Sequence, residues 1–196
     1  MEAPAAHLPA PGANPIGRRI VIVGAGGFGL AVAEALEAVG GWEIVGLVDD
    51  RWPDLTSAGR WPVLAASSGL PDLRPQADAV VVAIGRNTVR EAVFERARAA
   101  GFALPPVIHP RAYVARGAEV GAGAIVMAGV IVSHGCRVDE GALLNAGAVL
   151  DHDSQVERFA HVGIAASLGG GARVAERAVL VQGEILPAQG VKVQAH

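Results

Sequence analysis

Two histidines stand eighteen residues apart in the second half of the chain, and one of them has carboxylates on both sides. His134 is followed by His152, which lies in the run Asp151-His152-Asp153. A carboxylate beside an imidazole fixes its tautomer and stabilises its protonated form, which suits a general base. An exposed histidine with incidental acidic neighbours is the alternative, and the residues alone leave both open. Gly170 follows His152 at the same spacing of eighteen.

A periodicity of six explains why a spacing of eighteen matters. Every sixth residue from Ile108 to Leu186 is a branched aliphatic residue, and a mostly small residue stands two positions before each. A helix turns six residues through about 240° and a strand alternates with period two, so neither element produces this pattern. Hexapeptide repeats predict a parallel β-helix with three repeats in each triangular coil. Residues eighteen apart then stack on successive coils, about 4.8 Å apart.

This geometry separates the histidines into two groups. His152 occupies a corner of the prism, with His134 below it and Gly170 above it. His161 is expected to point outward from a flat face, near Asn145 on the coil below. His152 and His161 then belong to different corners of one prism, so a site that uses both needs a neighbouring subunit. The spacing therefore predicts an oligomer, most simply a closed trimer.

The first half of the chain predicts a nucleotide-binding unit. A buried strand over residues 19–23 runs into the glycine motif at 24–29, which is followed by a helix over 30–39. A second strand, 43–48, ends on two aspartates at the spacing of a residue that binds a ribose hydroxyl. A third strand, 79–84, ends in a glycine loop before a helix over 88–99. The expected substrate contacts here are Gly26, Gly27, Phe28, Asp49, Asp50, Gly85 and Asn87.

The glycine motif has two interpretations. Glycines let the backbone approach a phosphate, and the helix N-terminus beyond them offers unpaired N–H groups and a positive dipole. Many strand-to-helix turns use the same glycines for geometry alone. The strand before the motif, the helix after it and Asp49 favour nucleotide binding, and the nucleotide itself stays open.

Composition narrows the class of protein. Hydrophobic residues make up 52% of the chain and aromatic residues only 4%, with 26 glycines, which suits a coil interior of small aliphatic side chains. The net charge of -3 comes without a basic cluster, so nucleic acid is disfavoured as a partner. The single cysteine, Cys136, falls in the small column and is expected to be buried.

The sequence also predicts where the protein works. The longest apolar run, around residues 122–132, is too short and too rich in glycine to span a bilayer. The N-terminal residues lack the apolar core of a secretory signal, which predicts a cytoplasmic protein. We expect a flexible tail over 1–18, a Rossmann-like nucleotide-sugar-binding domain over 19–104 and a β-helix domain over 107–196. The hexapeptide pattern fails after Leu186, because Lys192 stands where the next aliphatic residue is expected. Glu184, two residues before Leu186, already interrupts the small column.

Five segments of the chain resemble a known family. They are GAGGFG, VDD, AIGRN, IHPRAYV and LLNAGAVLDHDSQVERFAHVG, within residues 19–190. The chain resembles the bacterial sugar acyltransferases of the sialic acid O-acetyltransferase (NeuD) family, and within it the N-acetyltransferases of nucleotide-linked amino sugars. The resemblance implies an α/β domain followed by a left-handed β-helix, a homotrimer, acetyl-CoA as co-substrate and no metal.

The resemblance also implies roles for residues on the coils. His152 matches the general base and Asp153 its carboxylate partner, a position where the compared N-acetyltransferases carry glutamate. His161 and Gly170 are assigned to acetyl-CoA, with the Gly170 N–H as donor to the thioester carbonyl, and Asn145 is assigned to the substrate. Family members carry further coil and a cap, so the resemblance implies a shortened C-terminal end.

Three functions follow. The first is transfer of an acetyl group from acetyl-CoA to the amine of a UDP- or GDP-linked 4-amino sugar in surface-glycan biosynthesis. The second is O-acetylation of a sugar hydroxyl, such as that of a sialic acid, by the same residues. The third is a nucleotide-sugar-binding protein that lacks acetyl-CoA binding. An NAD-dependent oxidoreductase is disfavoured, because nothing after residue 104 resembles a hydride-acceptor site.

Overall fold

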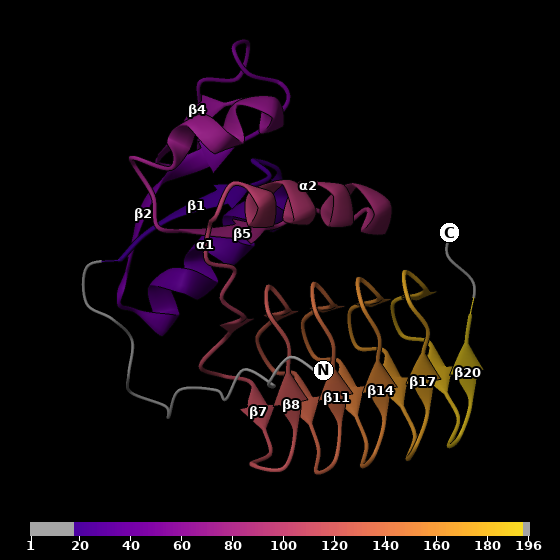
Figure 1. Ribbon diagram of the computed structural model, residues 1–196. Coiled ribbons are helices and arrows are strands. Elements are labelled where there is room, and N and C mark those ends of the chain that lie inside the picture. The colour runs from indigo at the N-terminus through magenta and orange to yellow at the C-terminus, as the bar shows by residue number, and fades with distance from the viewer. Residues whose placement is uncertain (1–17, 194–196) are drawn as a thin grey trace.

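The computed structural model describes residues 18–193, which form a sheet with helices followed by a long coil (Figure 1). The sheet has the strand order β3-β4-β2-β1-β5 and is parallel except for the β3–β4 pair. Its elements are β1 (Arg18–Val23), α1 (Gly27–Val39), β2 (Trp42–Val48), β3 (Ser57–Ala58), β4 (Trp61–Ala65), the 3-10 helix η1 (Ser67–Leu73), β5 (Ala79–Val82) and α2 (Asn87–Ala99).

The elements expected in this half are present, with small shifts at their ends. The first helix begins at Gly27, and the third strand ends at Val82. The sequence pattern did not predict β3, β4 and η1, which lie between the second and third expected strands. Pro62 lies inside β4 and Pro71 inside η1. Proline weakens the sequence signal of a strand or helix interior, which explains why these short elements were missed.

Fifteen two-residue strands make up the coil. They form three parallel sheets, with the orders β19-β16-β13-β10-β7, β20-β17-β14-β11-β8 and β18-β15-β12-β9-β6. The strands are β6 (Val107–Ile108), β7 (Tyr113–Val114), β8 (Glu119–Val120), β9 (Ile125–Val126), β10 (Ile131–Val132), β11 (Arg137–Val138), β12 (Leu143–Leu144), β13 (Val149–Leu150), β14 (Gln155–Val156), β15 (His161–Val162), β16 (Ser167–Leu168), β17 (Arg173–Val174), β18 (Val179–Leu180), β19 (Ile185–Leu186) and β20 (Val191–Lys192).

The register of the coil confirms the predicted stacking. Partners in each ladder differ by eighteen residues, as in Ile131 with Val149 and Leu143 with His161. The aliphatic and small columns together fill the interior from Ala118 to Leu186. Cys136 is 1% exposed, as expected for a core residue. The predicted fold class, a small α/β unit followed by a parallel β-helix, is confirmed.

The coil continues past the point where the sequence pattern fails. Val191–Lys192 pairs with β17 in the same parallel register. Lys192 and Glu184, the two charged residues at core positions, form an ion pair with 2.7 Å between Lys192 Nζ and Glu184 Oε1. The two departures from the pattern therefore compensate one another at the last described coil.

Helix α2 lies along the coil rather than across it (Figure 1). An α-helix rises about 5.4 Å per turn and stacked strands repeat every 4.8 Å or so, so a helix that lies along the coil can contact several consecutive coils. The contacts run antiparallel to the coil, so residues later in α2 meet earlier coils. The matched pairs are Asn87 with Arg177, Phe94 with Phe159, and Arg98 with Glu140.

The sheet that contains β6, β9 and β12 is covered by the first half of the chain. The outward residues Val107, Ile125 and Leu143 are buried in one cluster with residues of β1, α1 and β2. The next outward residue in this ladder is His161 on β15, followed by Val179 on β18. The apolar cluster shared with β1, α1 and β2 thus ends before His161, the first polar residue of this face.

Candidate active site

His152 and Asp153 lie together in the turn that follows β13. His152 Nδ1 is 2.9 Å from Asp153 Oδ2, which confirms the expected contact between imidazole and carboxylate. Asp153 adopts a left-handed backbone with φ 60°, a conformation that glycine takes at the stacked positions Gly135 and Gly171. In this turn the left-handed residue carries a carboxylate toward the neighbouring imidazole.

Glycines on the adjacent coils make room for both side chains. A Cβ at Gly170 would lie 2.7 Å from His152 Nε2, and a Cβ at Gly135 would lie 2.2 Å from Asp153 Oδ1. Side chains at those positions would therefore displace the pair. Among residues 18–193 the N–H of Gly170 donates no hydrogen bond, although the N–H of Gly171 bonds the carbonyl of His152 at 2.9 Å. Gly170 therefore lies beside the ring with a free N–H, and its assignment to the thioester carbonyl stays a prediction.

The charges around His152 favour its protonated form. Its pKa is raised above the ordinary value, first by the hydrogen bond to Asp153 and then by the charge of Asp151. The His152 side chain is 64% exposed, so its Nε2 edge is open to solvent. A histidine with a raised pKa, a fixed tautomer and an open edge is equipped to accept a proton from a bound nucleophile.

His161 has the opposite environment on a flat face of the same coil. Its Nε2 is buried without a hydrogen-bond partner within residues 18–193. Burial, with a smaller contribution from the charge of Arg90, lowers the pKa of His161 to about 4. Its ring is therefore neutral near pH 7. His161 and Asn145 line one pocket together with Ile164, Val181 and Gln182, so the expected proximity of His161 and Asn145 is present.

The two imidazoles do not meet within the described chain. His152 follows β13, whereas His161 lies on β15, a member of a different sheet. They share no hydrogen-bond partner among residues 18–193. One site that uses both imidazoles would need a second copy of the chain.

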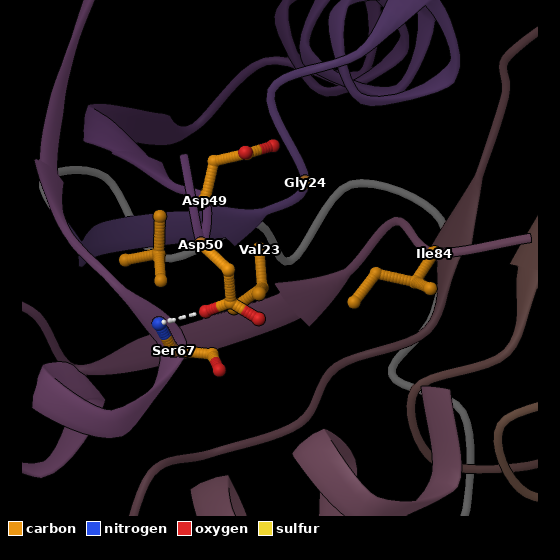
Figure 2. Close-up of a pocket in the computed structure, with 7 residues that line it drawn as sticks. Val23, Gly24, Asp49, Asp50, Ser67 and Ile84 are labelled. Atoms are coloured by element: carbon orange, nitrogen blue, oxygen red, sulfur yellow. Dashed lines mark hydrogen bonds between the residues drawn. The ribbon is translucent and has the colours of Figure 1, made fainter. Parts of the chain in front are cut away.

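The predicted nucleotide site is a pocket at the carboxyl ends of β1, β2 and β5 (Figure 2). Gly24 has φ 115°, and a Cβ there would lie 2.6 Å from the Ala83 carbonyl oxygen. A Cβ at Gly29 would lie 1.9 Å from the Gly24 carbonyl oxygen, so both glycines are required by close backbone packing. Gly26 and Gly27 face open space instead. The pocket is lined by Val23, Gly24, Val48, Asp49, Asp50, Ser67 and Ile84.

The two aspartates at the end of β2 have different partners. Asp49 accepts the N–H of Ala25 at 2.9 Å and the guanidinium of Arg51 at 2.7 and 3.0 Å. These bonds, that of Arg51 foremost, hold the pKa of Asp49 well below its usual range. Among the described residues, the N–H of Ser67 alone donates to Asp50, at 2.8 Å (Figure 2). Asp49 thus stabilises the glycine turn through its bond to Ala25, and Asp50, with fewer hydrogen bonds, has more of its carboxylate available in the pocket.

Two side chains, whose contacts with the coil the sequence did not predict, hold the loop after β5 against the coil. Asn87 is 7% exposed, and its amide donates to the carbonyls of Arg177 and Ala178 at 2.7 and 3.3 Å. The carbonyl of Gly85 accepts from Arg90 at 3.1 Å. The amide of Asn87 therefore bonds the coil, and it does not line the nucleotide pocket.

Arg90 was missed altogether. It is 1% exposed, and its guanidinium donates to the Ile84 and Gly141 carbonyls at 2.9 Å and to Phe159 at 2.7 Å. It also donates to Asn87 Oδ1 at 2.8 Å. The sequence did hold a signal for it, because Arg90 falls in the buried stripe of α2 with Asn87, Val93, Phe94 and Ala97.

Comparisons with known proteins agree with this geometry. The PglD N-terminal domain family matches residues 19–97. No curated protein sequence matches the chain. The perosamine N-acetyltransferase of Caulobacter crescentus, solved with CoA and GDP-perosamine, is 36% identical, with a TM-score of 0.77, over 90% of this chain and 89% of that one. The chain belongs to the family of nucleotide amino-sugar acetyltransferases.

A second member of this acetyltransferase family supports the same assignment. The acetyltransferase domain of PglB from Neisseria gonorrhoeae, solved with acetyl coenzyme A, is 33% identical, with a TM-score of 0.73. The match covers 87% of this chain and 88% of that one. WeeI from Acinetobacter baumannii, at 18% identity and a TM-score of 0.66, shares the fold. The coil of this acetyltransferase is accordingly the left-handed β-helix that the resemblance implied.

The described part of this acetyltransferase shows neither a membrane-spanning helix nor a metal-binding cluster. None of the helices within residues 18–193 is long and apolar enough to cross a membrane. The same residues contain no group of three or more histidine, cysteine or acidic side chains that could hold a metal ion.

Proposed function

We propose that the protein transfers the acetyl group of acetyl-CoA to the amine of a nucleotide-linked 4-amino sugar, with UDP or GDP as the nucleotide. The observation that carries this proposal is the His152–Asp153 pair beside Gly170. Solved relatives at 33% and 36% identity were bound to acetyl-CoA and to CoA with GDP-perosamine. The product class fits surface-glycan biosynthesis. We also propose that the reaction takes place in the cytoplasm.

The chemistry begins with attack of the neutral amine nitrogen on the thioester carbonyl carbon. The new C–N bond forms as the carbonyl oxygen becomes an oxyanion, and His152 Nε2 accepts the extra proton of the nitrogen. The free N–H of Gly170 stabilises the oxyanion. The C–S bond then breaks, and the proton passes from His152 to the departing CoA thiolate. Asp153 stabilises the protonated imidazole between these two steps.

The remaining predicted residues divide between the two substrates. Asp50, with Gly26, Gly27 and Phe28 at the start of α1, is proposed to hold the nucleotide. The pocket of His161 and Asn145 is proposed to hold the acetyl-CoA side and the sugar. A neutral His161 can donate or accept one hydrogen bond there without adding a charge.

We also propose that the active unit is a homotrimer. His152 and His161 lie on different sides of one coil, so a neighbouring copy is needed to complete one site from both. Three of the five outward positions of one sheet are apolar and exposed, with Tyr113 at 62%, Ile131 at 41% and Ile185 at 76%. Such a stack suits burial against another copy. Sedimentation equilibrium is expected to give three times the chain mass, and a monomer that is active would contradict this proposal.

The test of the reaction is thiol release from acetyl-CoA with matched acceptors. We expect release with a UDP- or GDP-linked 4-amino sugar and none with the same nucleotide sugar that carries a hydroxyl at that carbon. Mass spectrometry is expected to show acetylation of the amine. Release only with hydroxyl acceptors would replace this proposal with O-acetylation, and failure of calorimetry to detect CoA binding would contradict both.

A further inference from the structure

The turn that carries His152 differs from the other turns of the coil at a position hidden behind it. The small-residue column, which fills the inner corners of the prism, is alanine at most positions. At Ser154, directly after Asp153, it holds a hydroxyl, and at Cys136, one coil below, a thiol. Ser154 is 0% exposed and Cys136 is 1% exposed. Apart from Glu184 near the end of the coil, the polar members of the column thus lie behind the proposed catalytic turn.

These two side chains converge on one backbone atom. Ser154 Oγ donates to the Asp151 carbonyl oxygen at 2.5 Å, and Cys136 Sγ lies 3.0 Å from the same oxygen. The N–H of Ser154 also reaches that oxygen, at 3.3 Å. The Asp151 carbonyl therefore accepts from three groups, and it belongs to the residue immediately before His152.

The fold of such a turn does not need the hydroxyl. Left-handed residues other than glycine also occur at Phe159, Ala165 and Arg177. Each is followed by a fully buried alanine, and the turn closes with the backbone bond alone, at 3.0, 3.2 and 2.9 Å. Alanine is thus sufficient to hold a left-handed residue at a corner of this coil. The extra donors at the Asp151 carbonyl are therefore not needed to form the turn, and we look for their role in a feature that the other three turns lack.

What those turns lack is a pair of side chains that must keep a fixed distance. Asp153 Oδ2 and His152 Nδ1 are held 2.9 Å apart on an exposed corner, with no other protein group on the imidazole nitrogens within residues 18–193. The turn is also restrained by the stacked glycines and by backbone N–H bonds, from Asp153 to the His134 carbonyl at 3.0 Å and from Gly171 to the His152 carbonyl at 2.9 Å. The N–H of His152 donates to Asp151 Oδ1 at 2.8 Å. The Asp151 carbonyl anchors the start of the turn from inside, where water does not compete for its hydrogen bonds.

We propose that Ser154 is a positioning residue for the acyl transfer: by bonding the Asp151 carbonyl together with Cys136, it fixes the turn that aims His152 and Asp153. This inference rests on the proposed function, in which His152 is the base. Ser154 touches neither substrate. It acts through the backbone, so its loss leaves substrate binding intact and lowers the rate of the chemical step.

The test is Ser154→Ala, which installs the residue that the column holds at 160, 166, 172 and 178. We expect the variant to fold and assemble as the parent does, with kcat lower by about tenfold and with KM for both substrates unchanged. Ser154→Cys keeps a donor of the kind that Cys136 already provides, and it is expected to restore most of kcat. Unchanged kcat in Ser154→Ala, with or without a lower Tm, would overturn the proposal and leave a purely structural hydroxyl.

A double-mutant cycle separates this route from a general loosening of the coil. Asp153→Gly gives the turn the glycine that stands at Gly135 and Gly171 and removes the carboxylate that Ser154 is proposed to hold. Ser154→Ala is expected to lower kcat in the parent and to have little further effect in Asp153→Gly. Equal losses in both backgrounds would contradict action through the pair.

The failure of this inference can be told from failure of the proposed function. If His152→Ala retains full turnover, the proposed base is wrong. If His152→Ala is inactive and Ser154→Ala is fully active, the base stands and the positioning role of Ser154 is wrong.

Discussion

His152 and His161 are nine residues apart on one coil, and their surroundings oppose each other. The corner that carries His152 is open to water and supplies carboxylates, which raise the pKa of the imidazole. The flat face that carries His161 is covered by the α/β unit, and burial beside Arg90 lowers the pKa to about 4. Since a corner projects from the prism and a face can be covered, one regular scaffold supplies both a proton acceptor and a neutral imidazole. The position on the coil determines the chemistry of each histidine.

The largest expected effect is at the corner. His152→Ala removes the proton acceptor and is expected to lower kcat by about a thousandfold, within the range of general base catalysis. Thiol release from acetyl-CoA measures it. His134→Ala, at the stacked position one coil below, is the matched control and is expected to keep nearly full activity. Equal losses in both variants would mean that the corner tolerates no substitution, and the contrast between the histidines would lose its support.

The next effect concerns the stability of the flat face. Unfolded His161 binds a proton near pH 6.5 and folded His161 only near pH 4. Between these values unfolding takes up a proton, so stability falls as pH falls, by about 3 kcal/mol in total. His161→Gln is expected to abolish that loss. Urea unfolding at pH 7 and pH 4.5 measures it, with His109→Gln as control. A parent and a His161→Gln variant that lose equal stability would show that His161 is not buried as neutral imidazole.

A smaller effect separates the carboxylate from the imidazole. Asp153→Asn keeps the shape of the side chain and replaces the charged acceptor whose hydrogen bond does most to raise the pKa of His152. We expect kcat to fall by about tenfold and the acid limb of the pH profile to move to lower pH, because the unprotonated base then persists further into acid. Asp139→Asn, a half-buried carboxylate elsewhere on the coil that pairs with Arg137, is the control. An acid limb at an unchanged pH would show that Asp153 does not influence the pKa of His152.

The sequence could predict the corner because the coil is built from local repeats. A spacing of eighteen is enough to stack His152 on Gly170, and adjacency is enough to pair His152 with Asp153. The buried Ser154 was visible as an exception in the small column, but its acceptor, the Asp151 carbonyl, follows only from the turn geometry.

The flat face could not be predicted in the same way, because its environment comes from distant residues. Asn87 bonds Arg177 across ninety positions, and Arg90 joins the loop after β5 to the coil beside His161. No periodicity encodes such pairs. The sequence placed His161 on the face next to Asn145, whereas its burial and low pKa depend on the docking of α2.

The most direct test of the account is an NMR titration of both imidazoles in the intact protein, with His152→Ala and His161→Gln used to assign the signals. The account predicts that His152 titrates above the ordinary value of 6.5 and that His161 titrates near pH 4. Two histidines that both titrate near 6.5, or a reversed order, would contradict the claim that the corner and the face of this coil set opposite protonation states.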